Sequence, residues 1–139
     1  MANNLSDYLE AQLLNLLFRS QTAWKPSAIY IGLWTATLDD TATGSTAGEV
    51  SGGSYARQQV VQSDANWTAP GAAGLIDNVN AITFPQATAN WGTITDVMIV
   101  DTASGAGNCL FYGALTTPKT VNSGDTFKFN VGDLDISLA

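Results

Sequence analysis

Histidine is absent from this 139-residue sequence, and cysteine occurs once. Without histidine, the Ser-His-Asp and Cys-His nucleophile systems cannot be built, and the commonest proton shuttle near neutral pH is missing. With one cysteine and no histidine, zinc and most transition-metal sites lose their usual ligands. Cys109 lies in an apolar, strand-like run, where a free cysteine usually serves as a small hydrophobic residue. We therefore expect no cofactor, no bound metal and no enzymatic activity.

Charge is also scarce, because charged residues make up only 12% of the chain, about half the usual ~25%. The five basic residues are scattered singly, at Arg19, Lys25, Arg57, Lys119 and Lys128. Nucleic-acid binding requires a clustered basic surface, as does binding to an anionic membrane. No apolar run approaches the ~20 residues that span a bilayer. We expect a soluble protein, made in the cytosol, that contacts neither nucleic acid nor membrane.

The acidic residues leave one enzymatic alternative open, because glycosidases use a pair of carboxylates. Most of the acids are aspartates in turn-like segments, where the side chain usually hydrogen-bonds nearby backbone. Glutamate, the commoner acid in raised-pKa roles, occurs only at Glu10 and Glu49. A glycan-degrading enzyme is therefore the disfavoured alternative.

One helix is predicted, over residues 4–20, with Asn4 as its N-cap. The segment has no glycine or proline, and its leucines recur at helical spacing. Its apolar stripe is so wide that the helix is expected either to contact a partner or to plug one end of a β-sandwich. The candidate partner contacts on this helix are Leu5, Leu9, Leu14 and Phe18.

After Pro26 the hydrophobic pattern changes to a period of two, which is typical of strands. Strands are predicted at 29–34, 55–62, 80–84, 93–100, 109–115, 126–129 and 134–138, and a turn at 116–119. Short strands with regular turn signals favour a sandwich or jelly roll over a βαβ design. We expect a mainly β, single-domain protein in which a β-sandwich or jelly-roll-like barrel over residues 27–139 follows the N-terminal helix.

Further candidate partner contacts lie outside the helix. The loop at 39–53 is long and poor in hydrophobic residues, so it is expected to contain lattice contacts or an exposed tip; its candidates are Asp40 and Glu49. Trp24 and Trp67 lie in polar, turn-rich surroundings and are expected either to meet a partner or to anchor a loop. Arg57, alone on a neutral face, suits a charge-assisted hydrogen bond within the subunit or across an interface.

Five motifs are distinctive as a set: NLSDYLE at 4–10, IYIGLWT at 29–35, GGSYAR at 52–57, ITFPQATANWG at 82–92 and YGALTTPKTVNSGD at 112–125. Together they resemble a family of small bacteriophage virion structural proteins. Members of the family are commonly labelled tail fibre proteins, and the sequence also resembles head decoration, or cement, proteins. The resemblance covers nearly the whole chain.

The resemblance implies a virion component that assembles with other virion proteins. Our main expectation is a cement subunit that stabilises the head by bridging major capsid proteins, because the chain is short and has no fibrous repeat. The alternative is a tail fibre, collar or baseplate component that contacts the host surface and binds other tail proteins. A homo-oligomer is expected, and a trimer by analogy with jelly-roll virion proteins.

Overall fold

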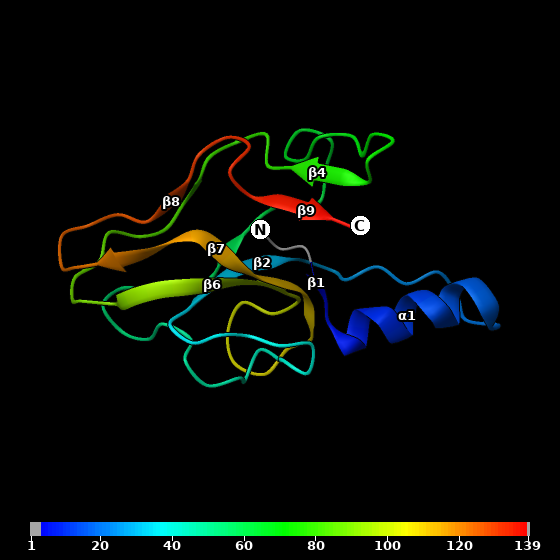
Figure 1. The fold of residues 1–139 in the computed structure, drawn as a ribbon, viewed down its shortest axis with the longest axis horizontal. Helices are drawn as coiled ribbons and strands as arrows, with labels where there is room; N and C mark the ends of the chain where they lie inside the picture. Colours follow the sequence, from blue (N-terminus) through cyan, green and yellow to red (C-terminus); the bar gives the residue numbers. More distant parts are fainter. Residues whose placement is uncertain (1–3, 139) are drawn as a thin grey trace.

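The computed structural model describes residues 4–138, and its fold is mainly β with one helix (Figure 1). The main sheet is antiparallel and has five strands in the order β1-β7-β6-β2-β3. Its strands are β1 (Asn4–Leu5), β7 (Cys109–Val121), β6 (Gly92–Val100), β2 (Tyr30–Trp34) and β3 (Gln58–Gln59). Two antiparallel ribbons pack over this sheet: β4 (Leu75–Asp77) with β9 (Asp135–Ser137), and β5 (Ile82–Thr83) with β8 (Lys128–Phe129). The prediction of a mainly β, sandwich-like fold with an N-terminal helix is confirmed.

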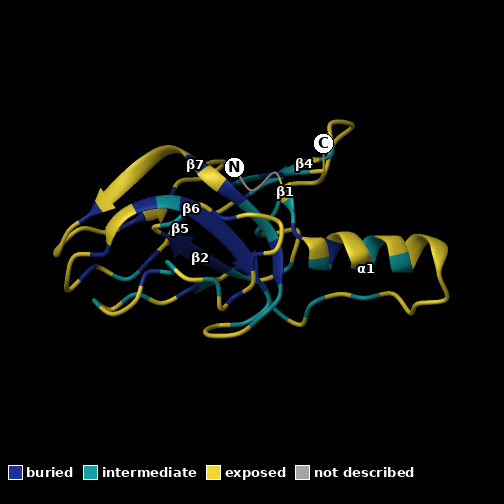
Figure 2. Cartoon of the chain, turned by 60° about the horizontal axis from the view of Figure 1, so that its bottom comes forward, coloured by how far each residue is buried: buried dark blue, intermediate teal, exposed yellow. Residues whose placement is uncertain are grey.

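The central strands are buried on both faces (Figure 2). On one face, Ile31 and Leu33 of β2 join a large apolar cluster with residues of both ribbons, such as Phe129. On the other face, Trp34 packs in a second cluster with Ala42 from the loop that follows β2. The predicted strand at 29–34 is therefore confirmed as buried on both sides, and the long loop serves as a covering layer.

The turn predicted at 116–119 is wrong, because β7 continues through this segment to Val121. The register of β7 with β6 shifts there: Ile94 faces Lys119, whereas Asp96 faces Ala114. Five positions along β7 thus match only two along β6, which is a β-bulge. Pro118 is tolerated inside the bulge because it does not remove a ladder hydrogen bond there. The turn-forming residues shape a bulge instead of a chain reversal.

The strand predicted at 55–62 is much shorter in the structure, where β3 pairs only with Tyr30 and Ile31. The remaining edge of β2 is occupied by the end of the long loop. Val50 donates its backbone N–H to the carbonyl of Leu33 at 3.0 Å, and Thr35 donates to Gly48 at 2.8 Å. Because the loop residues Gly48 and Val50 already hydrogen-bond to the backbone along this edge of β2, residues 55–57 have no strand to pair with. Strands β1 and β4 were not predicted.

The helix α1 spans Asp7–Phe18, so it is shorter at both ends than the predicted 4–20, and its N-cap is Ser6, not Asn4. The Ser6 hydroxyl accepts a hydrogen bond from the Leu9 amide at 3.2 Å and donates one to the Cys109 carbonyl. Asn4 cannot cap the helix because it is paired with Tyr112 in β1. The cap therefore also joins the start of the helix to β7.

Candidate assembly surface

Helix α1 projects from the β body, and the chain then runs back beside it (Figure 1). We call residues 7–29 the arm: α1 and the returning segment. Near the body, α1 is held by the Ser6 cap and by Leu9, which is buried in the main apolar cluster. The Asp7 amide also donates to the Asp40 carbonyl at 2.9 Å. The first turn of the arm is thus fixed to both the sheet and the long loop.

Two contacts hold the returning segment against the helix. The Gln21 side-chain amide donates to the Gln12 side-chain oxygen at 3.0 Å. The Trp24 ring meets the Tyr8 ring edge-to-face, with 5.7 Å between their centroids, and Trp24 is half-buried. Of the two alternatives expected for Trp24, these contacts favour the anchor.

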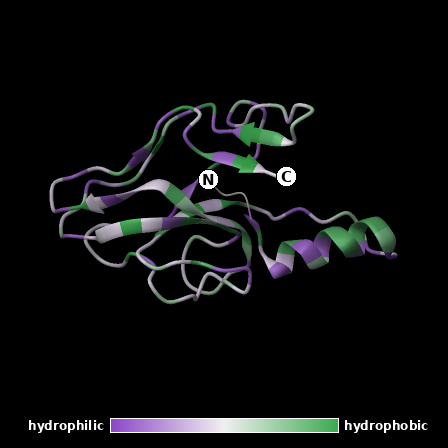
Figure 3. Cartoon of the chain, in the orientation of Figure 1, coloured by the Kyte–Doolittle hydropathy of each residue, from purple (hydrophilic) through white to green (hydrophobic). Residues whose placement is uncertain are grey.

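The far end of the arm is apolar and exposed. We call its four exposed large residues the tip: Leu14 (58% exposed), Leu16 (39%), Leu17 (69%) and Phe18 (79%). Figure 3 shows the same end of α1 coloured hydrophobic at the extremity of the molecule. Of the four helix residues expected to meet a partner, Leu14 and Phe18 are on this free surface.

The other two expected helix contacts are not on the free surface. Leu9 is buried, and Leu5 is half-buried against the main apolar cluster. The sequence-based choice missed Leu16 and Leu17. Their signal was present, because the segment from Leu13 to Phe18 is apolar at every position except Asn15.

Charge is distributed unevenly between the arm and the body. From residue 11 to residue 29 the arm has two bases, Arg19 and Lys25, and no acid, a net charge of +2. All twelve acids and the other three bases lie in the rest of the chain, a net charge of −9. The most apolar and exposed part of the molecule is therefore also the part that avoids negative charge.

Arg57 lies at the centre of a buried polar cluster. Its guanidinium donates to both carboxylate oxygens of Glu49, at 2.6 and 2.7 Å. It also donates to the carbonyls of Gly44 (2.8 Å), Thr102 (3.1 Å) and Gly105 (3.2 Å). One side chain therefore joins the long loop to the β6–β7 connection. Arg57 is only 6% exposed, so its expected hydrogen bond is made within the subunit, and the proposed partner contact at Arg57 is withdrawn.

Aromatic groups complete this cluster. The Arg57 guanidinium lies over the Trp34 ring, 5.7 Å from its centroid. The Tyr55 hydroxyl donates to Glu49 at 3.1 Å and accepts from the Leu33 amide at 2.9 Å. Burial raises the pKa of Tyr55 above its ordinary value, so the phenol is neutral. Glu49 is thus engaged inside the chain, and the loop at 39–53 is fastened to the body.

The two remaining candidate contacts differ in exposure. Asp40 is exposed beside the start of α1. Trp67 is half-buried, packs against the main apolar cluster and forms a bridge with Asn78. Its indole Nε1 is buried and has no hydrogen-bond partner among the described residues. Asp40 is therefore on an accessible surface next to the arm, whereas the Trp67 side chain packs mainly against the main apolar cluster.

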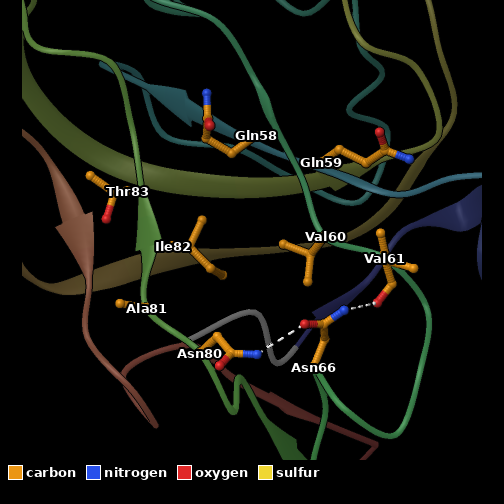
Figure 4. A pocket seen from close by; sticks show the side chains of 9 residues that line it. All are labelled: Gln58, Gln59, Val60, Val61, Asn66, Asn80, Ala81, Ile82 and Thr83. Atoms are coloured by element: carbon orange, nitrogen blue, oxygen red, sulfur yellow. Dashed lines mark hydrogen bonds between the residues drawn. The ribbon is translucent and has the colours of Figure 1, made fainter.

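A shallow cleft of about 370 Å³ opens between β3 and β5 (Figure 4). Its floor is apolar, with Val60 and Ile82. Two of its amide side chains are held by internal bonds: Asn80 donates to Asn66 at 3.0 Å, and Asn66 donates to the Val61 carbonyl at 3.0 Å. Its nine lining residues include no ionisable side chain, so they offer no acid or base.

Two carboxyl groups, those of Asp77 and Asp135, occupy facing positions on β4 and β9. A hydrogen bond to Asp135, together with burial and the charge of that carboxylate, raises the pKa of Asp77. Glycosidase carboxylates are about 5–9.5 Å apart, with sugar or water between them. Asp77 and Asp135 are directly opposed in the strand register, where facing side chains lie close together.

Cys109 is fully buried, as predicted. Burial raises the pKa of its thiol to about 12, although a hydrogen bond with Ser6 acts in the opposite direction. A thiol in this state is a poor nucleophile at neutral pH. Within residues 4–138, no three or more acidic or cysteine side chains gather as a metal site. The same residues contain no helix that is long and apolar enough to cross a membrane.

Comparison with known proteins gives one family. A family model described as podophage GP4 fiber I protein gp80 matches residues 4–137. No curated protein matches the chain. The match includes the arm, the main sheet and both ribbons, so it covers the projecting helix as well as the β body. This chain therefore belongs to the podophage fiber I protein family, a family of phage virion structural proteins of the fibre type.

Proposed function

We propose that the chain is a non-enzymatic subunit of a virion fibre, built to be assembled through its arm while the β body faces outward. The observation that carries this proposal is the arm itself: an apolar, acid-free helix end that projects from a body fastened by its own hydrogen bonds. Large exposed apolar patches on soluble proteins usually mark interaction sites. The facing carboxyl groups of Asp77 and Asp135 and the buried thiol of Cys109 do not form a catalytic arrangement that would favour an enzyme instead.

Head decoration is the second candidate. It is favoured by the absence of any fibrous repeat or heptad run in the sequence, because a shaft would require one. A decoration subunit would bridge major capsid proteins, whereas a fibre subunit would bind other tail proteins. A fibre subunit of this size needs a partner that supplies the shaft.

The copy number per virion separates these two functions. We expect quantitative mass spectrometry of purified particles to find the protein in a few dozen copies or fewer, and gold-labelled antibodies to bind at the tail. Because symmetric shells repeat each decoration site over the whole head, hundreds of copies with labelling over the head would support decoration instead. Absence of the protein from purified particles would reject both functions.

A further inference from the structure

We infer that the cleft between β3 and β5 is the place where an extended segment of another virion protein adds to this chain as a strand. This contact lies beyond the proposed function, because it is on the β body, away from the arm, and it rests on that function only in taking the partner from the virion. The reason lies in the backbone of the two cleft walls. No described strand pairs with the outer edge of β3, and β5 pairs only with β8.

On the β3 wall, the strand register shows which backbone groups are open. The Val60 amide donates to the Ile29 carbonyl at 3.1 Å and so points toward β2. Because successive residues of a strand direct their N–H and C=O groups to opposite edges, those of Gln59 and Val61 point away from β2. The Val61 carbonyl accepts from the Asn66 side chain at 3.0 Å. Neither backbone group of Gln59 has a hydrogen-bond partner on that side among residues 4–138.

The β5 wall is built in the same way. The Phe84 amide donates to the Phe127 carbonyl at 3.0 Å and so points toward the β8 side. By the same alternation, the N–H and C=O groups of Ala81 and Thr83 point away from β8, to the side where Figure 4 shows the cleft. Two edges with open backbone groups therefore line one space of about 370 Å³.

The side chains of the cleft also suit an added strand. Val60 and Ile82 are buried in its floor, and Val61 is 59% exposed beside them. An added strand would therefore cover apolar surface while its backbone pairs with the walls, and strand addition draws affinity from main-chain hydrogen bonds and specificity from alternate side chains. The hydrogen bond from Asn80 to Asn66 joins the two walls at one end of the cleft (Figure 4). The added segment must leave the cleft at that end.

The charge of the cleft determines the chemistry of the occupant. None of the lining residues is ionisable, and none is proline, although lysine and proline are common means by which strand edges discourage pairing. A charged side chain that entered the cleft would lose water and find no opposite charge there. Copies of this chain, at a net charge of −7 each, also repel one another. An uncharged segment of a different protein, with small apolar residues at alternate positions, fits the cleft better than a second copy does.

Hydrogen exchange of the full chain, free and in purified virions, tests this contact. Peptides that cover residues 58–62 and 80–84 should exchange about tenfold more slowly in virions, because pairing protects amides that are open in the free protein. A peptide that covers residues 116–120 of β7, which are also exposed, is the matched control and should exchange equally in both samples. Equal exchange of the cleft peptides in the two samples would overturn the inference.

Two double variants separate strand pairing from contact through side chains. Gln59→Pro, Thr83→Pro removes two outward N–H groups that the chain's own ladders do not use, which is where an edge strand tolerates proline. Gln59→Ala, Thr83→Ala keeps both N–H groups and removes the side chains. We expect the protection of the remaining outward amides, those of Val61 and Ala81, to be lost only in the proline variant.

The unfolding temperatures of the free variants show whether each is folded, and the wild-type comparison does not depend on them. Protection that survives the prolines, or that is lost with the alanines, would overturn strand addition. Protection already present in concentrated free protein would identify a second copy as the occupant and overturn the partner named here. A wild-type chain that is present in virions with a freely exchanging cleft would reject this inference alone, whereas its absence from virions would reject the proposed function as well.

Discussion

At the scale of single residues, Arg57 explains how a loop without a strand can be fixed. The loop at 39–53 has no regular structure, yet Gly44 and Glu49 within it both accept hydrogen bonds from the buried guanidinium. The planar fork of arginine can serve a carboxylate and several carbonyls at once, which a lysine ammonium cannot do in this geometry. The loop is thereby made part of the body.

Replacement of Arg57 by methionine should destabilise the protein severely. The change would leave the Glu49 carboxylate without its cationic partner, and the carbonyls of Gly44 and Gly105 without the donor that Arg57 supplies. Breaking a buried ion pair by removing one partner costs about 3–5 kcal/mol, and urea unfolding should show a loss of this size. Arg57→Lys should recover only part of it. The control, Lys128→Met, changes an exposed cation and should unfold like the wild type; an equal loss in both would contradict the role given to Arg57.

At the scale of elements, the ribbon of β4 and β9 contains a built-in pH dependence. Asp77 and Asp135 face each other across the ribbon, and the pKa of Asp77 is raised by the hydrogen bond to Asp135 and by burial. A carboxyl group whose pKa is higher in the folded state than in the unfolded state contributes stability at low pH. That contribution is complete below the unfolded pKa and is lost as the pH rises through the folded pKa.

The variant Asp77→Asn should therefore unfold at a higher temperature than the wild type at pH 7, and the difference should shrink toward pH 4. Relief of like-charge repulsion between facing strand positions is of the order of 0.2–1 kcal/mol, or about 1–4 °C in a protein of this size. Scanning calorimetry from pH 4 to pH 8 would measure it. Asp64→Asn, in an exposed turn, is the control; a pH-independent gain at Asp77 would contradict the explanation.

The elements also show what sequence can and cannot predict here. Strand 29–34 and the existence of the helix were predictable because each has a strong local periodicity. The start of the helix was not predictable, because Asn4 pairs in a strand with Tyr112, which is distant in sequence. The segment with Pro118 shows the same limit, since one set of turn-forming residues serves either a chain reversal or a bulge. The choice depends on the partner strand.

The candidate surface was predictable to a similar extent. The excess of leucine on the helix pointed to Leu14 and Phe18, and both are exposed at the tip. Arg57 could not be assigned from sequence, because its use inside the chain depends on a loop that brings Glu49 and Gly44 to it. Burial by distant segments is the information that local patterns lack.

At the scale of the whole molecule, the separation of charge from apolar surface predicts how association responds to salt. Outside residues 7–29 the chain has ten acids and three bases, so bodies of net charge −7 repel one another, whereas the tip is apolar. Raising the salt concentration from 0.1 to 1 M shortens the Debye length from about 10 to 3 Å. Any association of copies through the tip should therefore become tighter with added sodium chloride, as sedimentation at a series of protein concentrations would show. Weaker association in high salt would indicate ion pairs at the interface instead.

The outer edge of β7 bears on how the chain behaves at high concentration. Beyond Tyr112 no described strand pairs with this edge, and residues 116–120 are exposed. A long free edge invites strands of neighbouring chains to add to it, but proline, lysine and a bulge all interfere with such pairing, and Pro118, Lys119 and the bulge lie together there. The free edge of β7 therefore resists the addition of strands from neighbouring chains, which lowers the tendency of concentrated subunits to aggregate.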